Sequence, residues 1–288
     1  MTGFYWIASY PKSGNTWLRL FLQSLSGGGG AVDLTVPLDV VWHAATRPRF
    51  EEALELESGD LTNDEITCAR PRQYEIEAAA AAAPLWRKVH DRWGLTPAQE
   101  PLFPPGVTLG IIYLVRDPRD IAISFAHHNN TSLDETIAGL AHPKYGIGME
   151  RNCQPKQLPQ HLGSWSGHVQ SWLDTGNPRL LVIRYEDLSR APEAHFAAAA
   201  DFLGIKAAPA QIAAAVQAVR FDVLQAAEDR HGFRERPAAA RRFFRQGTAG
   251  GWRGSLTARQ VARIESDHGA VMQRLGYGLS GSVPSPAP

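Results

Sequence analysis

The segment that most constrains the fold lies at residues 4–25. The apolar run FYWIA at residues 4–8 is typical of a buried strand, and the apolar positions of residues 18–25 have the spacing of a helix. Between them stands YPKSGNTW, a tight turn that contains Gly14. A strand, a turn and a helix start in this order direct backbone N–H groups and the positive end of the helix dipole at one point. The segment therefore predicts a site for a phosphate or sulfate group at the start of the fold.

Side chains of the turn strengthen this anion site. Lys12 supplies a full positive charge, and Ser13 and Thr16 supply hydroxyl donors. The whole chain carries 29 Lys and Arg against 29 Asp and Glu, so its net charge gives no general attraction to anions. We therefore expect a local anion site, with neither nucleic acid nor a membrane as a partner.

Two further apolar runs, at residues 108–115 and 180–183, are typical of buried parallel strands. Stretches of helical period separate the strands, which indicates an α/β fold. We expect a single domain over residues 1–279, with a central parallel sheet flanked by helices and a P-loop-like turn after the first strand. Residues 129–161 lack periodicity and are expected to form a lid or an acceptor loop. The Ser- and Pro-rich residues 280–288 are expected to be a disordered tail.

Cysteine content and terminal sequence bear on location. The two cysteines, Cys68 and Cys153, are too few for a disulfide framework and offer no metal-ligand pair of useful spacing. The N-terminus has no basic region followed by a long apolar core, and no apolar run is long enough to cross a bilayer. These features favour a reducing, cytoplasmic setting. No cluster of carboxylates offers a metal site, and we expect no metal.

Polar residues follow the second and third predicted strands. Arg116 stands at the carboxyl end of a strand, where open α/β sheets bind ligands, and its guanidinium can hold a phosphate through two hydrogen bonds. A surface Arg–Asp pair is the alternative. Asp117 and Pro118 are good first residues of a helix that carries Ser124 two turns on. Tyr185 can contact a nucleotide or simply close the edge of the core.

Two more segments supply candidate groups. The Gly-rich residues 245–254 begin with Arg245 and let backbone amides approach an anion closely. In the segment 86–91, Lys88 and His90 face the same side of an extended chain. A cation beside His90 favours its neutral form, which makes it a candidate general base, although a lone histidine is more often structural.

These motifs occur in a fixed order along the chain. YPKSGNTW is followed by KVH at residues 88–90, YLVRDPRDIAIS at 113–124, RYEDL at 184–188 and RQGTAGGW at 245–252. Together they resemble the sulfotransferases that use 3′-phosphoadenosine-5′-phosphosulfate (PAPS), and LGSW at 162–165 resembles their bacterial members. The resemblance implies an enzyme of the EC 2.8.2 type. It would move a sulfuryl group from PAPS to a hydroxyl, or less readily an amine, of a small-molecule acceptor and release 3′-phosphoadenosine 5′-phosphate (PAP).

The resemblance also implies a role for each matched residue. His90 would be the general base, and Lys12 and Lys88 would assist at the transferred group. Trp17 and Phe221 would contact the adenine. The residues implied to bind PAPS are Lys12, Ser13, Gly14, Asn15, Thr16, Trp17, Arg116, Ser124, Tyr185, Phe221, Arg245, Gln246 and Gly247.

The chain departs from the family pattern at several positions. Gln246 stands where many members have Lys, and residues 218–220 lack the small hydroxyl side chains that often precede the adenine aromatic. The family's dimer motif KxxxTVxxxE is degenerate, with other residues at most of its places. A homodimer is therefore possible but not implied. The places of the motif are taken by Arg253, Thr257, Ala258 and Ala262.

Two alternatives stay open. A P-loop-like nucleotide kinase would have GxxxxGK[ST], whereas Lys12 precedes the glycine here; Glu186 and Asp187 could still serve a magnesium nucleotide. A nucleotide-binding module without catalysis would need no base, and the pair Lys88 and His90 argues against it. If His90 is the base, the rate should fall on acidification through about pH 6.5. Residues near the motifs that could line an acceptor pocket are Trp42, His43, Trp93, Phe125, His127 and His128.

Overall fold

The structure is a computed structural model that describes residues 2–150, 153–177, 179–238 and 240–280. Its strands are β1 Phe4–Ser9, β2 Trp42–His43, β3 Leu85–Val89, β4 Thr108–Val115, β5 Gly146–Ile147, β6 Gln160–His161 and β7 Leu180–Arg184. Its helices are α1 Asn15–Ser26, α2 Arg47–Leu54, α3 Asn63–Ala80, α4 Pro118–Asn129, α5 Leu133–Ala141, α6 Trp165–Leu173, α7 Tyr185–Arg190, α8 Pro192–Phe202, α9 Pro209–Ala218, α10 Phe221–His231 and α11 Ala258–Arg274. Two short 3-10 helices are η1 Pro105–Val107 and η2 Gly251–Gly254.

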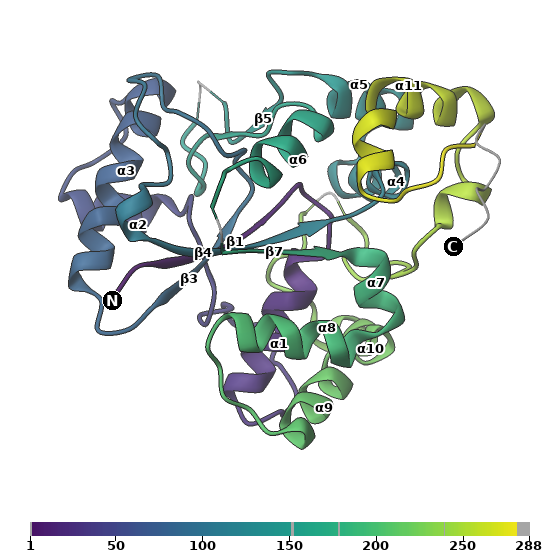
Figure 1. Ribbon diagram of the computed structural model, residues 1–288, viewed down its shortest axis with the longest axis horizontal. Helices are drawn as coiled ribbons and strands as arrows, with labels where there is room; N and C mark the ends of the chain where they lie inside the picture. Colours follow the sequence, from purple (N-terminus) through teal and green to yellow (C-terminus); the bar gives the residue numbers. More distant parts are fainter. Residues whose placement is uncertain (1, 151–152, 178, 239, 281–288) are drawn as a thin grey trace.

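Five strands form the central sheet in the order β2-β3-β1-β4-β7, and every neighbouring pair is parallel (Figure 1). β1 lies in the middle, where Ile7 pairs with Lys88 of β3 on one side and with Ile112 of β4 on the other. The predicted central parallel sheet is therefore confirmed. The carboxyl ends of β1, β3 and β4 lie side by side, which brings the residues after each strand to one edge of the sheet.

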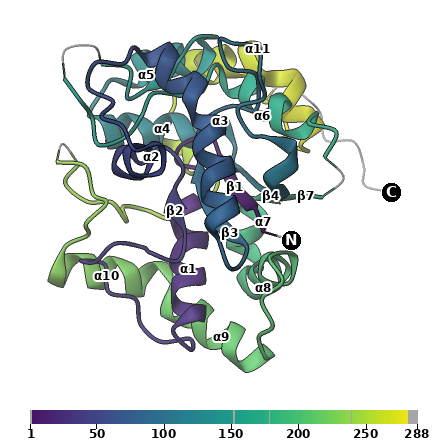
Figure 2. The ribbon, with the colours of Figure 1, turned by 90° about the vertical axis from the view of Figure 1, so that its left-hand side faces the viewer.

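The side chains of β1 alternate between two hydrophobic cores. Phe4 and Trp6 pack with α3, α4, α5, α6 and α11, whereas Tyr5 and Ile7 pack with α1, α8, α9 and α10. Figures 1 and 2 show these two groups of helices on opposite faces of the sheet. Because β1 is buried on both faces, its sequence is a continuous apolar or aromatic run from Phe4 to Ala8 and does not alternate.

Residues 129–161 are not the long irregular loop that their composition predicts. They contain α5, which begins with a capping box in which Ser132 and Glu135 bond each other's backbone N–H groups, and the antiparallel pair β5–β6. The S-x-x-E signal was present in the sequence, but the surrounding Gly, Pro and Asn residues obscured it. A lid role for this segment stays a prediction. Of the expected tail, residues 281–288 lie outside the described residues.

Among the described residues, none of the helices is both long and apolar enough to cross a bilayer. Cys68 and Cys153 are both free thiols.

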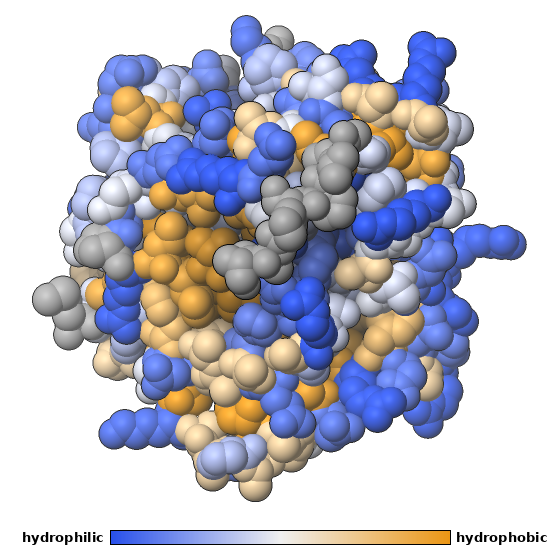
Figure 3. Space-filling view, turned by 45° about the vertical axis from the view of Figure 1, so that its right-hand side comes forward, coloured by the Kyte–Doolittle hydropathy of each residue, from blue (hydrophilic) through white to orange (hydrophobic). Residues whose placement is uncertain are grey.

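The face drawn in Figure 3 carries a broad hydrophobic area bordered by hydrophilic residues.

Candidate active site

A pocket of about 480 Å³ opens at the carboxyl edge of the sheet. Its wall includes every residue expected from the motifs except Ser13, although these residues come from segments that are far apart in the chain. The expected residues on the wall are Lys12, Gly14, Asn15, Thr16, Trp17, Lys88, His90, Arg116, Ser124, Tyr185, Phe221, Arg245, Gln246 and Gly247.

The turn between β1 and α1 forms the floor of one half of the pocket. Lys12 has a φ of 70° and Gly14 a φ of 99°, so both adopt left-handed backbone that tightens the turn. Gly14 is the N-cap of α1, and no side chain caps the helix there. A Cβ atom at Gly14 would come within 2.9 Å of the Tyr185 ring, so the close fit requires glycine. The first N–H groups of α1 are therefore left to an anion.

Of the two buried polar side chains at the turn, Asn15 is hydrogen-bonded and Ser13 is not. Asn15 Nδ2 donates to the carbonyl of Ile7 at 2.9 Å and to Ser9 Oγ at 3.2 Å, which ties the helix start to β1. Ser13 is fully buried, and its hydroxyl has no partner within the described part of the chain. Ser13 is not on the pocket wall, so a role for it in binding an anion stays a prediction.

Lys12 brings a buried cation to the same half of the pocket. Its Nζ lies 3.3 Å from His128 Nδ1 and 4.4 Å from the centroid of the Phe243 ring. Burial, with help from Lys88 and Arg116, lowers the pKa of Lys12 to about 7. Among the described residues, Lys12 contacts an imidazole and an aromatic ring and forms no ion pair with a carboxylate, so a bound anion would stabilise its charged form.

Arg116 joins this half of the pocket to the C-terminal loop. Its Nη1 donates to the carbonyl of Lys12 at 3.2 Å and its Nη2 to the carbonyl of Thr248 at 2.9 Å. The guanidinium lies 4.1 Å from the centroid of the Tyr185 ring, and its Nε is buried without a partner among residues the structure describes. The alternative of a surface Arg–Asp pair is wrong, because Asp117 pairs with Arg119 at 2.7 Å.

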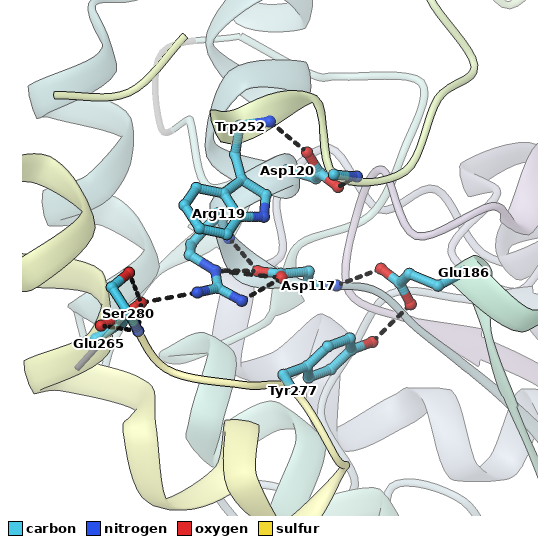
Figure 4. A network of polar contacts seen from close by, with 9 residues as sticks. Asp117, Arg119, Asp120, Glu186, Trp252, Glu265, Tyr277 and Ser280 are labelled. Atoms are coloured by element: carbon cyan, nitrogen blue, oxygen red, sulfur yellow. Dashed lines mark hydrogen bonds and ion pairs between the residues drawn. The ribbon is translucent and has the colours of Figure 1, made fainter. Parts of the chain in front are cut away.

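A polar network fixes the Gly-rich loop against the start of α4 (Figure 4). The Asp120 carboxylate accepts hydrogen bonds from the backbone N–H of Gly250 at 2.6 Å and of Trp252 at 2.9 Å. Arg119 bonds both Asp117 and Glu265 of α11, each at 2.7 Å, and lies over the Trp252 ring. The network holds the loop of residues 245–252 against Arg116, as a second anion cradle requires.

Glu186 belongs to the same network and not to the pocket. It accepts from the backbone N–H of Asp117 at 3.0 Å and from the hydroxyl of Tyr277 at 2.9 Å. Asp187 lies against Arg190. Neither carboxylate is on the pocket wall, which removes the feature that favoured a magnesium-nucleotide kinase.

Aromatic residues line the space between the two cradles. Trp17 Nε1 donates to the carbonyl of Val219 at 2.9 Å, which fixes the indole beside α10. Phe221 lies against Gly247, where φ is 62° and a Cβ atom would overlap the Phe221 ring. The Tyr185 hydroxyl donates to the carbonyl of Gly247 at 3.1 Å. Trp17 and Phe221 are both on the pocket wall.

His90 follows β3 and faces the pocket as a neutral ring. Its Nδ1 lies 2.8 Å from the carbonyl of Ser9, so Nδ1 carries the proton and Nε2 is the acceptor. Burial, then the charge of Lys88, hold its pKa well below 6.5. The loss of activity on acidification stays a prediction, and this lowered pKa moves it to a pH below 6.5 in the free protein.

The backbone around His90 is anchored by buried groups that sequence reasoning did not identify. His168 Nε2 donates to the His90 carbonyl at 3.0 Å, and the Trp172 indole donates to the Asp91 carbonyl at 3.0 Å. Asp91 forms a buried two-bond ion pair with Arg70 of α3, at 2.7 and 3.0 Å. The LGSW segment thus starts the helix, α6, that positions the candidate base.

Lys88 lies near an ion pair whose two partners could not be matched from the sequence. Arg19 of α1 binds Glu235 through two hydrogen bonds of 2.9 and 2.8 Å, although the two residues are far apart in the chain. Both lie on the pocket wall. Burial and Arg19 lower the pKa of Lys88 to about 8, and Glu235 opposes them. The only indication of this ion pair in the sequence was Arg19 itself, an arginine among the apolar residues of α1.

The candidates for an acceptor pocket divide into two groups. His43 and His128 lie on the pocket wall. Trp93 and Phe125 pack in or against the core. Trp42 and His127 are not among the residues of the pocket wall. Wall residues that the sequence reasoning did not name as site residues include Arg19, Gln157, Arg234, Glu235, Phe243 and Phe244.

Comparison with known proteins decides the family. The sequence model of the sulfotransferase domain matches residues 4–276, nearly the whole chain. The chain belongs to the sulfotransferase domain family. Sulfotransferase 1E1 of Homo sapiens is 28% identical over 184 residues, which is 63% of this chain and about half (52%) of the human protein. Cytosolic sulfotransferase 17 of Arabidopsis thaliana is 24% identical over 91% of this chain and 72% of its own length.

Solved structures agree with the fold of this family. Retinol dehydratase in complex with androsterone and the inactive cofactor PAP superposes with a TM-score of 0.59 at 19% identity, over 98% of this chain and 82% of that one. Mouse sulfotransferase SULT7A1 complexed with PAP also gives 0.59 at 18% identity, over 94% and 85%. This sulfotransferase domain thus has the α/β fold of family members.

Across the described ranges, no group of three or more His, Cys, Asp or Glu side chains could hold a metal ion. A reaction without a metal stays a prediction.

Proposed function

We propose that this protein is a PAPS-dependent sulfotransferase that transfers a sulfuryl group to a hydroxyl of a small-molecule acceptor, with His90 as the general base. One observation carries the proposal: Lys12 in the first cradle, Arg116 at the second and a neutral His90 all face one pocket. Membership of the sulfotransferase family supports it.

The donor set of the pocket fits PAPS, which carries anionic groups at both the 5′ and the 3′ positions. Lys12 and the N-terminal N–H groups of α1 would hold the 5′-phosphosulfate. Arg116, Ser124 and the 245–247 backbone would hold the 3′-phosphate, and the unpartnered Nε of Arg116 is a donor available for it. Trp17 and Phe221 would enclose the adenine, and Tyr185 would contact the nucleotide. PAP would leave the same contacts as the product.

Catalysis by these residues would be positioning and electrostatic stabilisation. PAPS supplies an activated sulfuryl group with a good leaving group. Lys12 would stabilise the charge that develops on the leaving phosphate oxygen, and Lys88 would face the sulfonyl oxygens. His90 Nε2 would take the proton of the acceptor hydroxyl, a contribution typically about 10²–10⁴-fold.

Relatives inform the acceptor and the location. One solved structure of retinol dehydratase holds androsterone and another holds retinol, so that protein binds small apolar molecules with an oxygen function. We propose a small-molecule acceptor for this chain as well, reached through the lid formed by residues 129–161. A cytoplasmic location is proposed too, supported by the name of the Arabidopsis relative.

The test separates binding from turnover. Calorimetry with PAP in the presence of a chelator should show binding without magnesium, and incubation of PAPS with a panel of phenols and alcohols should add the mass of one sulfuryl group to at least one of them. His90→Asn should abolish transfer and leave PAP affinity unchanged, whereas the exposed His231→Asn should change neither.

Three outcomes would contradict the proposal. A requirement for magnesium in binding would favour the kinase alternative. PAP binding without transfer to any acceptor would favour the module that only binds nucleotide. Full turnover in His90→Asn would move the base elsewhere.

A further inference from the structure

His43 is a second imidazole on the wall of the pocket, and nothing in the mechanism above uses it. It ends β2, where it pairs in register with Lys88 of β3. Its Nδ1 accepts a hydrogen bond from the backbone N–H of Ala45 at 3.0 Å. The neutral ring must therefore carry its proton on Nε2. This Nε2 is buried and has no hydrogen-bond partner in the described part of the chain.

His43 and His90 present opposite groups to one space. Their ring centroids are 5.8 Å apart, and the rings meet at 70°, edge to face. His90 has its proton on Nδ1 and a free electron pair on Nε2, whereas His43 has a free N–H at Nε2. Burial holds the pKa of both rings well below 6.5, with Lys88 as the next contribution, so both stay neutral at pH 7. The two neighbouring rings thus carry one acceptor and one donor.

A buried N–H without a partner costs free energy in the unliganded protein, which a ligand that accepts its hydrogen bond would recover. Lys88, which pairs with His43 in the ladder, is a cation and cannot accept a hydrogen bond. The group that His43 needs is an oxygen or nitrogen with an available lone pair, placed beside His90.

We propose that His43 binds the acceptor atom itself: its Nε2–H donates to the acceptor oxygen while that hydroxyl donates its proton to His90 Nε2, so that the site selects alcohols and phenols over amines. This inference rests on the proposed sulfotransferase function and specifies its acceptor class.

The selectivity for hydroxyls over amines follows from the number of lone pairs on the acceptor atom. A hydroxyl oxygen has two lone pairs, so one can accept from His43 while the other forms the new O–S bond. The S–O bond to the 5′-phosphate breaks, its electron pair leaves on the phosphate oxygen of PAP, and the hydroxyl proton passes to His90 Nε2. A neutral amine has a single lone pair. If that pair accepts from His43, it cannot attack sulfur, and if it attacks sulfur, the His43 N–H loses its partner.

Substitutions at His43 can separate this role from a structural one. His43→Asn keeps an oxygen that can accept from the Ala45 N–H but places no donor at the position of Nε2. His43→Gln is longer and can present an N–H near that position. We expect transfer from PAPS to 2-naphthol to fall about 10–100-fold in His43→Asn, with partial recovery in His43→Gln. PAP affinity by calorimetry should stay unchanged in both, and the wild-type protein should sulfate 2-naphthol much faster than 2-naphthylamine.

A second readout needs no turnover. Nitrogen-15 spectra of the imidazole rings in the PAP complex should show the proton of His43 on Nε2 and that of His90 on Nδ1, assigned with the two single variants. A proton of His43 on Nδ1, unchanged transfer in His43→Asn, or equal sulfation of the amine would each overturn the inference.

The two proposals fail in different ways. If the wild-type protein does not bind PAP, the sulfotransferase proposal fails and this inference falls with it. If it binds PAP and sulfates 2-naphthol regardless of the residue at position 43, only the inference fails. If it binds PAP but sulfates neither probe, the ring spectra with and without 2-naphthol decide, since a His43 Nε2 signal that 2-naphthol does not shift overturns the role.

Discussion

Lys12 shows at the scale of one residue how the pocket is prepared for an anion. A lysine that is buried and lies near two other cations loses part of its preference for the charged form. The left-handed backbone at Lys12 adds local strain that a non-glycine residue accepts only where the fold requires it. A phosphate group bound in the site would offset both the lost preference for the charged form and the backbone strain. The charged form of Lys12 is then coupled to binding.

This coupling predicts proton uptake. In the free protein the pKa of Lys12 is about 7, so at pH 8 the amine is mostly neutral. The 5′-phosphate of PAP should raise this pKa, and binding at pH 8 should therefore take up close to one proton, with a further fraction from Lys88, whose pKa is about 8. PAP affinity should fall as the pH rises above about 7. His128, Lys88 and Arg116 are the titratable or charged groups that contact or shift Lys12.

Calorimetry of PAP binding in buffers of different ionisation enthalpy measures the uptake directly. Lys12→Arg is the matched variant, because its guanidinium stays charged throughout this range and should show less proton uptake at pH 8. Equal uptake in the wild-type and Lys12→Arg proteins would show that Lys12 is not the group that titrates.

At the scale of an element, the loop of residues 245–252 acts through its glycines. Gly247 lets the backbone pass directly against the Phe221 ring while its carbonyl accepts from Tyr185. Asp120 holds the far end of the loop through the N–H groups of Gly250 and Trp252. The loop is thus fixed between an aromatic ring and a carboxylate, and a small shift at Gly247 would move both its contact with Phe221 and the backbone that Arg116 bonds at Thr248.

Gly247→Ala should weaken PAP binding, because the added methyl group must displace the Phe221 ring and because φ is 62° there. We expect a loss of about 1–3 kcal/mol of binding free energy, the range typical of overpacking a tight contact. Gly232→Ala is the control: φ is 81°, but nothing lies within 4 Å of the added atom. Equal losses in the two variants, measured by calorimetry with PAP, would assign the effect to backbone strain and not to Phe221.

At the scale of the whole molecule, the candidate base depends on an ion pair between layers. Arg70 of α3 and Asp91 after β3 are 0% and 1% exposed, and Asp91 also accepts from the backbone N–H of His161. Arg70 further donates to the carbonyl of Pro159. One buried pair therefore connects the sheet, a helix and the strand β6, and the residue before Asp91 is His90. The Arg70–Asp91 contact therefore affects both the stability of the fold and the position of His90.

Removing one partner should be costly. Arg70→Met leaves the Asp91 carboxylate buried and unpaired, and we expect a loss of about 3–5 kcal/mol in the free energy of unfolding. Arg72→Met removes the exposed pair with Glu75 on the same helix and should cost about 0–1 kcal/mol. Urea denaturation of both variants followed by fluorescence gives the comparison. A loss in Arg70→Met no larger than in Arg72→Met would mean that the buried pair does not stabilise the fold.

The sequence by itself determined the parallel sheet, the turn at residues 10–17 and most of the residues that meet in the pocket. It could do so because each motif directly follows a strand, and parallel strands of one sheet bring their carboxyl ends together. It also contained the cap of α5, whose short polar signal was outweighed by neighbouring loop-forming residues. Such local features depend on a few adjacent residues, so they are readable in the chain.

Only the tertiary structure decided the charge states of the pocket residues and their hydrogen-bond and ion-pair partners. The low pKa of His90, the bond from His168 to its carbonyl, the pair of Arg19 with Glu235 and the free N–H of His43 all join segments that are distant in sequence. Burial and hydrogen bonding depend on what packs around a group, and that environment exists only after the layers have assembled. The chain thus specifies which groups reach the pocket, and the packing specifies which proton each of them holds.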